Sequence, residues 1–295
     1  MAGSQRLLHG HGAGVTAAQV SARTVRGRLS LRAEMDARGH TVLAARVHEG
    51  AFHLSKPYWD GQVLMVQWVN PTAGIFAGDM LDSRVSVGPG ASMLVTTPSA
   101  TRIHTRLSRD QPPGEQHQHF HVSTDGWLEV QPEWLIPQRG SAFLQKTRIE
   151  VEAGGSLFYA ELLAPGRVAH GEALVFDSLD LRTRLTIGGK LVAQERLLAG
   201  APDRCWQLRS RSGAALFSAT VWMVLPGLAP AAIAALRECL AAEPECEAGL
   251  AVLPDDLFVI RVLAPQGLVI RRLMRSLRAL LARELRPLRM DMRKL

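Results

Sequence analysis

Residues 84–97 read RVSVGPGASMLVTT, a strand pattern on both sides of the tight turn Gly88-Pro89-Gly90. Short runs rich in Val, Leu and Thr favour extended backbone, and glycine supplies the conformations that a tight turn needs. Pro98 follows directly, and proline ends a hydrogen-bonded ladder because it has no N–H to donate. The stretch predicts a strand, a turn and a second strand.

The same unit recurs along the chain at intervals of about 30 residues. Residues 117–129 turn at Asp-Gly, residues 147–161 turn at Gly-Gly, and a fourth unit, residues 179–198, again turns at Gly-Gly. Pro132 and Pro165 follow the second and third units. Such recurrence predicts a weak internal repeat that stacks into solenoid-like β layers. Antiparallel hairpins in an ordinary sandwich fit the pattern equally well.

The last seventy residues change character. Residues 230–242 predict a short helix, residues 257–263 a strand, and residues 268–285 an amphipathic helix. One face of that last helix is aliphatic, and the other carries arginines that face solvent or a partner: Arg271, Arg275 and Arg278.

The predicted fold class is mainly β (α+β), with stacked β-sheets of strand–turn–strand units and a few C-terminal helices. We expect a flexible N-terminal segment over residues 1–20 and a single β-rich domain over residues 21–295, whose part from about residue 228 onward is α/β.

The composition is that of a globular protein, with 47% hydrophobic and 21% charged residues in a chain of 295. The three cysteines, Cys205, Cys239 and Cys246, form no C-x-x-C pair, which disfavours a disulfide framework and a Cys-rich zinc site. A reducing, cytoplasmic location is expected. Residues 212–236 carry no charge, but Pro226 and Pro230 interrupt them, which favours a strand and then a helix over a membrane span.

The basic charge is confined to one end of the chain. Residues 271–295 contain nine Lys or Arg against Glu284 and Asp291, which accounts for the whole formal net charge of +7. A solvated helix face and a partner-binding tail are both compatible with this distribution. A nucleic-acid-binding protein remains an alternative, with a footprint only one helix wide.

Residues 70–79, NPTAGIFAGD, form the most informative loop. Gly74 and Gly78 would let backbone N–H groups approach a phosphate, but the nucleotide-binding loop has a lysine after its second glycine. Here Asp79 stands in that position and would repel a phosphate. Two interpretations remain: a structural turn, or a carboxylate presented from a rigid loop.

Four stretches in order along the chain resemble the urease accessory protein UreD family, called UreH in some species. They are NPTAGIFAGDML (70–81), LVTTPSATRIHT (94–105), WLEVQPEWLIP (127–137) and ELLAPGRVAHGE (161–172). The residues that carry the resemblance, several of them structural, are Pro71, Gly78, Asp79, Thr96, Thr97, Pro98, Glu129, Pro132, Glu133, Glu161, Gly166, Arg167 and Glu172. The chain departs from the family pattern at Thr72-Ala73-Gly74, where a double glycine is usual.

The resemblance implies a maturation factor and not an enzyme. It implies stacked, helically wound β-sheets, and a scaffold that joins UreF and the GTPase UreG, docks on urease apoprotein and assists nickel insertion. No tightly bound cofactor is expected, GTP is bound only through UreG, and nickel is in transit. No nucleic acid and no membrane are expected as partners.

Transit of Ni²⁺ favours single carboxylates spaced along a passage, because the ion must be released as well as bound. We hypothesise that several carboxylates in the matched stretches line such a route: Asp79, Glu129, Glu133, Glu161 and Glu172. The alternative is that each caps a turn or pairs with an arginine such as Arg167.

A second metal-like pattern is His117, His119 and His121, which share one face of a strand. Weak nickel binding and a solvated polar face are its two interpretations. A metal-dependent hydrolase that uses the His and Glu residues is a further alternative, although the chain has no G-x-S-x-G or H-E-x-x-H motif.

Overall fold

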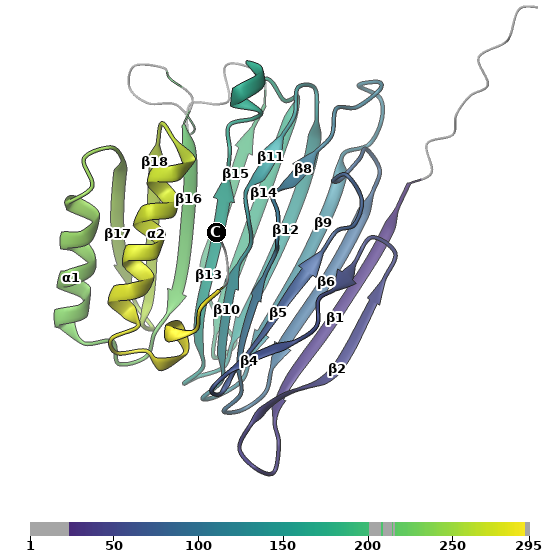
Figure 1. Ribbon diagram of the computed structural model, residues 1–295. Coiled ribbons are helices and arrows are strands. Elements are labelled where there is room, and N and C mark those ends of the chain that lie inside the picture. Colours follow the sequence, from purple (N-terminus) through teal and green to yellow (C-terminus); the bar gives the residue numbers. More distant parts are fainter. Residues whose placement is uncertain (1–23, 201–207, 209–213, 215, 293–295) are drawn as a thin grey trace, which may run out of the picture.

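The computed structural model describes residues 24–200, 208, 214 and 216–292. The predicted flexible segment at residues 1–20 lies outside the described residues, as does Cys205. Two β-sheets lie face to face, and two helices flank one end of the second sheet (Figure 1).

The first sheet has seven strands in the order β15-β14-β12-β9-β6-β1-β2. Their bounds are Arg26–Met35 (β1), Thr41–Glu49 (β2), Met80–Val87 (β6), Gly114–Val122 (β9), Ala142–Val151 (β12), Ser178–Ile187 (β14) and Lys190–Ala199 (β15).

The second sheet follows the order β17-β18-β16-β13-β10-β7-β5-β3, with β4, β8 and β11 paired alongside. Their bounds are His53–Leu54 (β3), Tyr58–Asp60 (β4), Val63–Val69 (β5), Ser92–Thr96 (β7), Thr101–Ile103 (β8), Trp127–Gln131 (β10), Leu135–Pro137 (β11), Ser156–Leu163 (β13), Phe217–Val224 (β16), Glu247–Leu253 (β17) and Leu257–Ala264 (β18). The helices are α1 (Pro230–Ala241), α2 (Gly267–Leu281) and two short 3-10 turns, η1 (Val168–His170) and η4 (Arg286–Arg289).

The chain winds from one sheet to the other in each repeat. Neighbouring strands β6, β9, β12 and β14 run parallel in the first sheet, and β7, β10 and β13 run parallel in the second. We call the turns that join β6 to β7, β9 to β10 and β12 to β13 the corners. They are alike, because Ala91, Gly126 and Gly155 each donate a backbone N–H to the carbonyl three residues earlier. The prediction of stacked, wound β layers is confirmed, and the hairpin alternative is wrong for these three units.

The fourth unit differs from the other three. Strands β14 and β15 pair antiparallel within the first sheet. Gly188 and Gly189 both have positive φ, 55° and 80°, which is the two-residue turn that folds adjacent strands into a hairpin. The prediction that residues 179–198 continue the repeat is therefore wrong.

The apolar core lies between the two sheets and extends from the corners to the opposite ends of the strands. Parallel pairing lines up inward-facing side chains of the first sheet in one row: Val85, Phe120, Ile149 and Leu185. The Phe120 ring lies 5.4 Å from the ring of Tyr159 on the second sheet. Strands β7, β10 and β13 end one or two residues before Pro98, Pro132 and Pro165, as predicted.

The helices cover the outer face of the second sheet at its C-terminal end (Figure 1). The uncharged run at residues 212–236 contains β16 and the first part of α1, which begins at Pro230 as predicted. Helix α2 buries the aliphatic face that its periodicity predicts, although it ends at Leu281 instead of residue 285. Strand β17 was not predicted. Among the described residues, no helix combines the length and the apolar character that crossing a membrane requires.

Candidate functional site

A row of polar side chains crosses the inward face of the first sheet, two positions farther from the corners than the apolar row. Backbone pairing places its members side by side on five strands, and we call them the polar row: Ser83, Gln118, Thr147, Thr183 and Glu195. The first four are buried. Buried polar groups need hydrogen-bond partners, and Thr147 donates one to Oε1 of Gln118 at 3.0 Å.

Glu161 faces the polar row from the second sheet. Its Oε1 accepts hydrogen bonds from the Tyr159 hydroxyl and from Nε2 of Gln145, both at 2.9 Å. Burial raises the pKa of Glu161 to about 7, and the nearby carboxyl of Glu195 adds to the rise. Within the described part of the chain, no Lys or Arg forms a salt bridge with it. Its carboxyl is therefore divided between protonated and ionised forms near neutral pH.

Glu195 closes the polar row at the edge of the first sheet. Burial raises its pKa, although the Arg261 guanidinium, 2.8 Å from Oε2, opposes the rise. Two carboxyls with raised pKa values that act on each other across an interior are typical of functional sites. The sequence analysis missed Glu195 and the polar row. A signal was present, because Ser83, Gln118 and Thr147 stand at equivalent positions of the three successive repeats.

Three cavities adjoin along this interior. An interior cavity of about 60 Å³ is lined by Gln118, Gln145, Tyr159 and Glu161 among others. It shares Trp68, Thr97, Thr101 and Gln116 with a cavity of about 180 Å³ that opens at the loop of residues 70–75. At its other end it shares Pro132, Glu133 and Leu162 with a groove of about 510 Å³ beneath α2. The three cavities thus adjoin one another through shared lining residues, and Glu161 lines the middle one.

Glu133 lies where the interior cavity meets the groove. Its carboxylate pairs with Nη2 of Arg271 at 2.5 Å, and its side chain is 10% exposed. Its backbone N–H donates to Oγ1 of Thr97 at 2.8 Å, while Oγ1 of Thr96 donates to the Gln131 carbonyl at 2.6 Å. Thr96 and Thr97 therefore hold the end of β10 in place.

Glu129 points to the outer face of the second sheet, away from the interior cavity. It is fully buried and binds the Arg278 guanidinium through both oxygens, at 2.8 and 3.2 Å. Nε2 of Gln131 also donates to it at 2.7 Å. This bidentate pair holds α2 against the sheet. Glu129 therefore fits the alternative in which a carboxylate pairs with an arginine, and it does not line the interior cavity.

Asp79 anchors its loop. Its two carboxylate oxygens accept the backbone N–H groups of Val25 and Phe76 at 2.8 and 2.9 Å. At Gly74, whose φ is 153°, a Cβ would lie 2.3 Å from the Arg102 carbonyl oxygen, so only glycine fits. These contacts favour the structural-turn interpretation of the loop that begins at Pro71 and includes Gly78.

Glu172 is likewise held by arginine. Arg167 donates to both of its oxygens, at 2.8 and 2.6 Å, and the hydrogen bonds lower the pKa of Glu172 to about 2. At Gly166 a Cβ would lie 2.3 Å from the Glu172 carbonyl oxygen, which explains the glycine. Glu172 therefore fits the alternative interpretation, in which the carboxylate pairs with Arg167.

The three histidines lie on the outer face of the first sheet, opposite buried Phe120. Each Nε2 lies between 3.2 and 3.4 Å from its own carboxylate partner, those of Glu115, Glu150 and Glu152. In the part of the chain that the structure describes, no three His, Cys, Asp or Glu side chains converge as metal ligands. The histidines form separate pairs on a polar face.

The structure thus divides the five predicted carboxylates. Glu161 and Glu133 line one cavity, whereas Glu129, Asp79 and Glu172 hold the fold together. Fold and site together define a β-solenoid of two wound sheets with an interior cavity that Glu161 lines and a helical flank.

The family profile described as UreD urease accessory protein matches residues 25–293. The chain is 39% identical over 277 residues to a urease accessory protein UreD of Opitutus terrae, an alignment that covers 91% of this chain and 98% of the relative. It is 36% identical over 187 residues to a UreD of Deinococcus radiodurans, covering 62% of this chain and 63% of that protein. A UreD of Cupriavidus metallidurans is 29% identical over 255 residues, covering 83% and 86%. The chain belongs to the UreD urease accessory protein family, as its four motifs indicated, and the family supports a role in urease maturation.

Proposed function

We propose that the protein is a non-enzymatic urease maturation factor that conducts Ni²⁺ through its interior while bound to UreF, UreG and urease apoprotein. The observation that carries this proposal is Glu161, which lines the interior cavity with no cationic partner in the described chain. GTP enters only through UreG, and the complex is cytoplasmic.

The chemistry of the route suits a divalent ion in transit. Ni²⁺ accepts carboxylate, amide and water oxygens, and the route offers Glu161, Gln118 and Gln145. A carboxyl whose pKa is about 7 must release its proton before it binds a metal. Binding of Ni²⁺ at Glu161 is therefore weak and reversible near neutral pH. Passage of the ion requires such weak binding, whereas storage of the ion does not.

Two of the five carboxylates keep their place in this proposal. Glu161 provides the midpoint of the route, and Glu133 provides its end at the α2 side. Asp79, Glu129 and Glu172 act through the fold, because they do not line the interior cavity and because backbone N–H groups or guanidinium groups occupy their oxygens. The histidines His117, His119 and His121 stay outside the route.

Deletion of the gene from a ureolytic host, with complementation, tests the role as a whole. We expect urease that is expressed and assembled but poor in nickel, and a tagged copy of the protein that co-purifies with UreF, UreG and urease. Urease of normal nickel content in the deletion strain would overturn the proposal. Turnover of an amide or ester by the purified protein alone would overturn its non-enzymatic part.

A further inference from the structure

Glu161 and Arg261 lie in the same cross-strand row of the second sheet. Backbone pairing places Glu161 opposite Thr220 on β16, and Thr220 opposite Arg261 on β18. Thr220 and Arg261 point to the interior, because Trp222 and Val259 on the same strand faces belong to the core between the sheets. Two strand spacings separate the backbones of Glu161 and Arg261 by about 10 Å. An extended arginine and a glutamate can meet across that distance, because the threonine between them is short.

Arg261 nevertheless does not bind Glu161. Its Nη2 lies 2.8 Å from Oε2 of Glu195, which projects from β15 at the edge of the first sheet. The side chain of Arg261 is 61% exposed and that of Glu195 is 23% exposed, so this ion pair lies at the margin of the interior. The pair keeps the guanidinium at the sheet edge and away from the interior cavity.

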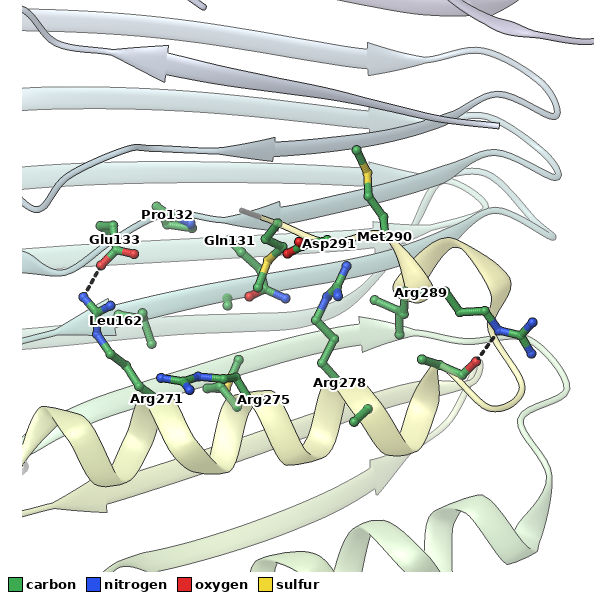
Figure 2. Close-up of a pocket in the computed structure, with 16 residues that line it drawn as sticks. Gln131, Pro132, Glu133, Leu162, Arg271, Arg275, Arg278, Arg289, Met290 and Asp291 are labelled. Carbon is green, nitrogen blue, oxygen red and sulfur yellow. Dashed lines mark hydrogen bonds and ion pairs between the residues drawn. The ribbon is translucent and has the colours of Figure 1, made fainter. Parts of the chain in front are cut away.

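Two other carboxylates of the same region each bind an arginine that is within reach. Arg278 binds buried Glu129 through both oxygens. Figure 2 shows the Arg271 guanidinium on the Glu133 carboxylate, where the interior cavity meets the groove beneath α2. Glu161 differs from both, although an arginine stands in its own row. Glu195 is the group that occupies that arginine.

We propose that Glu195 is a positioning residue that holds Arg261 away from Glu161 and so leaves the Glu161 carboxylate to a metal cation. This inference rests on the proposed function, because the cavity needs an unoccupied carboxylate only if a cation is to bind there. A guanidinium on Glu161 would occupy its oxygens and place a positive charge in the cavity, which repels Ni²⁺. The alternative is that the Glu195–Arg261 pair only stabilises the sheet edge.

The groups that face Glu161 determine what its variants report. From the strands packed against it these are the Tyr159 hydroxyl, the Glu195 carboxyl and Arg261, and across the interior cavity Glu133, which already binds a guanidinium. Of these four groups, Arg261 carries the positive charge. Once Glu195 is replaced, Arg261 is therefore released to pair with the Glu161 carboxylate.

Urea unfolding between pH 4.5 and 8 tests the inference without nickel. The comparison is between Glu195→Ala and Glu195→Ala combined with Arg261→Met, because both lack the Glu195 carboxyl and their difference reports on Glu161. In the double variant Glu161 stays buried without a cation, so its pKa stays raised and the free energy of unfolding falls as the pH rises from 4.5 to about 7. In Glu195→Ala the guanidinium lowers the pKa of Glu161, and we expect this fall to be lost.

Calorimetric titration with Ni²⁺ tests the consequence for metal binding. Glu161→Gln supplies the background, because it keeps every surface histidine and lacks the interior carboxylate. Above this background, we expect Glu195→Ala to bind Ni²⁺ at least about tenfold more weakly than wild type, and the double variant with Arg261→Met to recover the binding. Glu247→Ala is the control, because it removes an exposed carboxylate of β17 and should leave both readouts unchanged.

Parallel pH profiles of the single and the double variant would overturn the proposal, because they would mean that the ion pair only stabilises the edge. Weaker Ni²⁺ binding that Arg261→Met does not restore would also overturn it. The expected pH profiles together with Ni²⁺ binding no greater in wild type than in Glu161→Gln would support the holding of Arg261 and overturn nickel binding at Glu161. If Glu195→Ala does not fold, Glu195→Gln takes its place, because it keeps the shape of the side chain and removes the charge.

Discussion

Replacing Glu161 with glutamine should make the protein more stable at and above neutral pH. In the folded protein the pKa of Glu161 rises from 4.5 to about 7 because the carboxyl is buried. A pKa unit corresponds to about 1.4 kcal/mol, so ionising the buried carboxyl costs about 3 kcal/mol more than ionising it in the unfolded chain. Glutamine keeps an oxygen that accepts from Tyr159 and Gln145 but carries no charge.

The sign of the pH dependence follows from proton binding. Between pH 4.5 and about 7 the folded state holds a proton on Glu161 that the unfolded state has lost. Stability therefore falls as the pH rises through this window and is level above it. The variant lacks this fall, so the two proteins should have similar stability near pH 4.5 and differ by about 3 kcal/mol near pH 8.

Urea unfolding followed by tryptophan fluorescence between pH 4.5 and 8 measures this difference. Glu247→Gln is the control, because Glu247 is exposed at the start of β17 and its replacement should leave the pH profile unchanged. Parallel pH profiles for wild type and Glu161→Gln would refute the reasoning, because they would mean that the carboxyl ionises freely in the folded protein.

Three further substitutions test the anchors of the fold. Arg278→Ala removes a bidentate ion pair from the buried carboxylate of Glu129, and should lower the free energy of unfolding by about 3–5 kcal/mol in urea titrations. Arg167→Ala removes the hydrogen bonds that hold the pKa of Glu172 near 2. The free energy of unfolding of the wild type should fall by on the order of 1–2 kcal/mol as the pH falls from 4.5 toward 2, and that of the variant should fall by less. Gly74→Ala places a Cβ 2.3 Å from a backbone carbonyl oxygen and should cost at least about 2 kcal/mol, seen as a lower thermal midpoint.

Matched variants sharpen these three tests. Arg278→Met combined with Glu129→Gln removes both charges and should be more stable than Arg278→Ala, since the double variant buries no charge at residue 129. Gly249→Ala is the control for Gly74→Ala, because a Cβ at Gly249 meets nothing within 4 Å. A Gly74→Ala protein as stable as Gly249→Ala would contradict the close approach at residue 74.

The solenoid was predictable because its signals are local. The GPG turn after Val87 and Pro98 after β7 act on their own neighbours, and the unit repeats along the chain. The fourth unit was misread because a Gly-Gly pair serves either a corner or a hairpin. Only the φ angles of Gly188 and Gly189 decide between the two.

The candidate site was predictable only in part, because it depends on contacts between distant segments. Glu129 and Arg278 are 149 residues apart, and Glu133 and Arg271 are 138 apart, so no spacing rule joins them. The motif stretches included Glu161, but among the described residues it differs from the other four carboxylates because neither a guanidinium nor a backbone N–H group binds its oxygens. Glu195 lies outside the motifs and reaches the site only through the pairing of β14 with β15.

The nickel content of urease matured in cells that carry Glu161→Gln tests the interior route most directly. We predict that the variant folds, is at least as stable as wild type at pH 8 and co-purifies with UreF, UreG and urease, while the urease it serves contains much less nickel. Urease from the Glu247→Gln control should be fully loaded. Full nickel loading with Glu161→Gln, in a complex of normal composition, would contradict the claim that nickel passes this carboxylate.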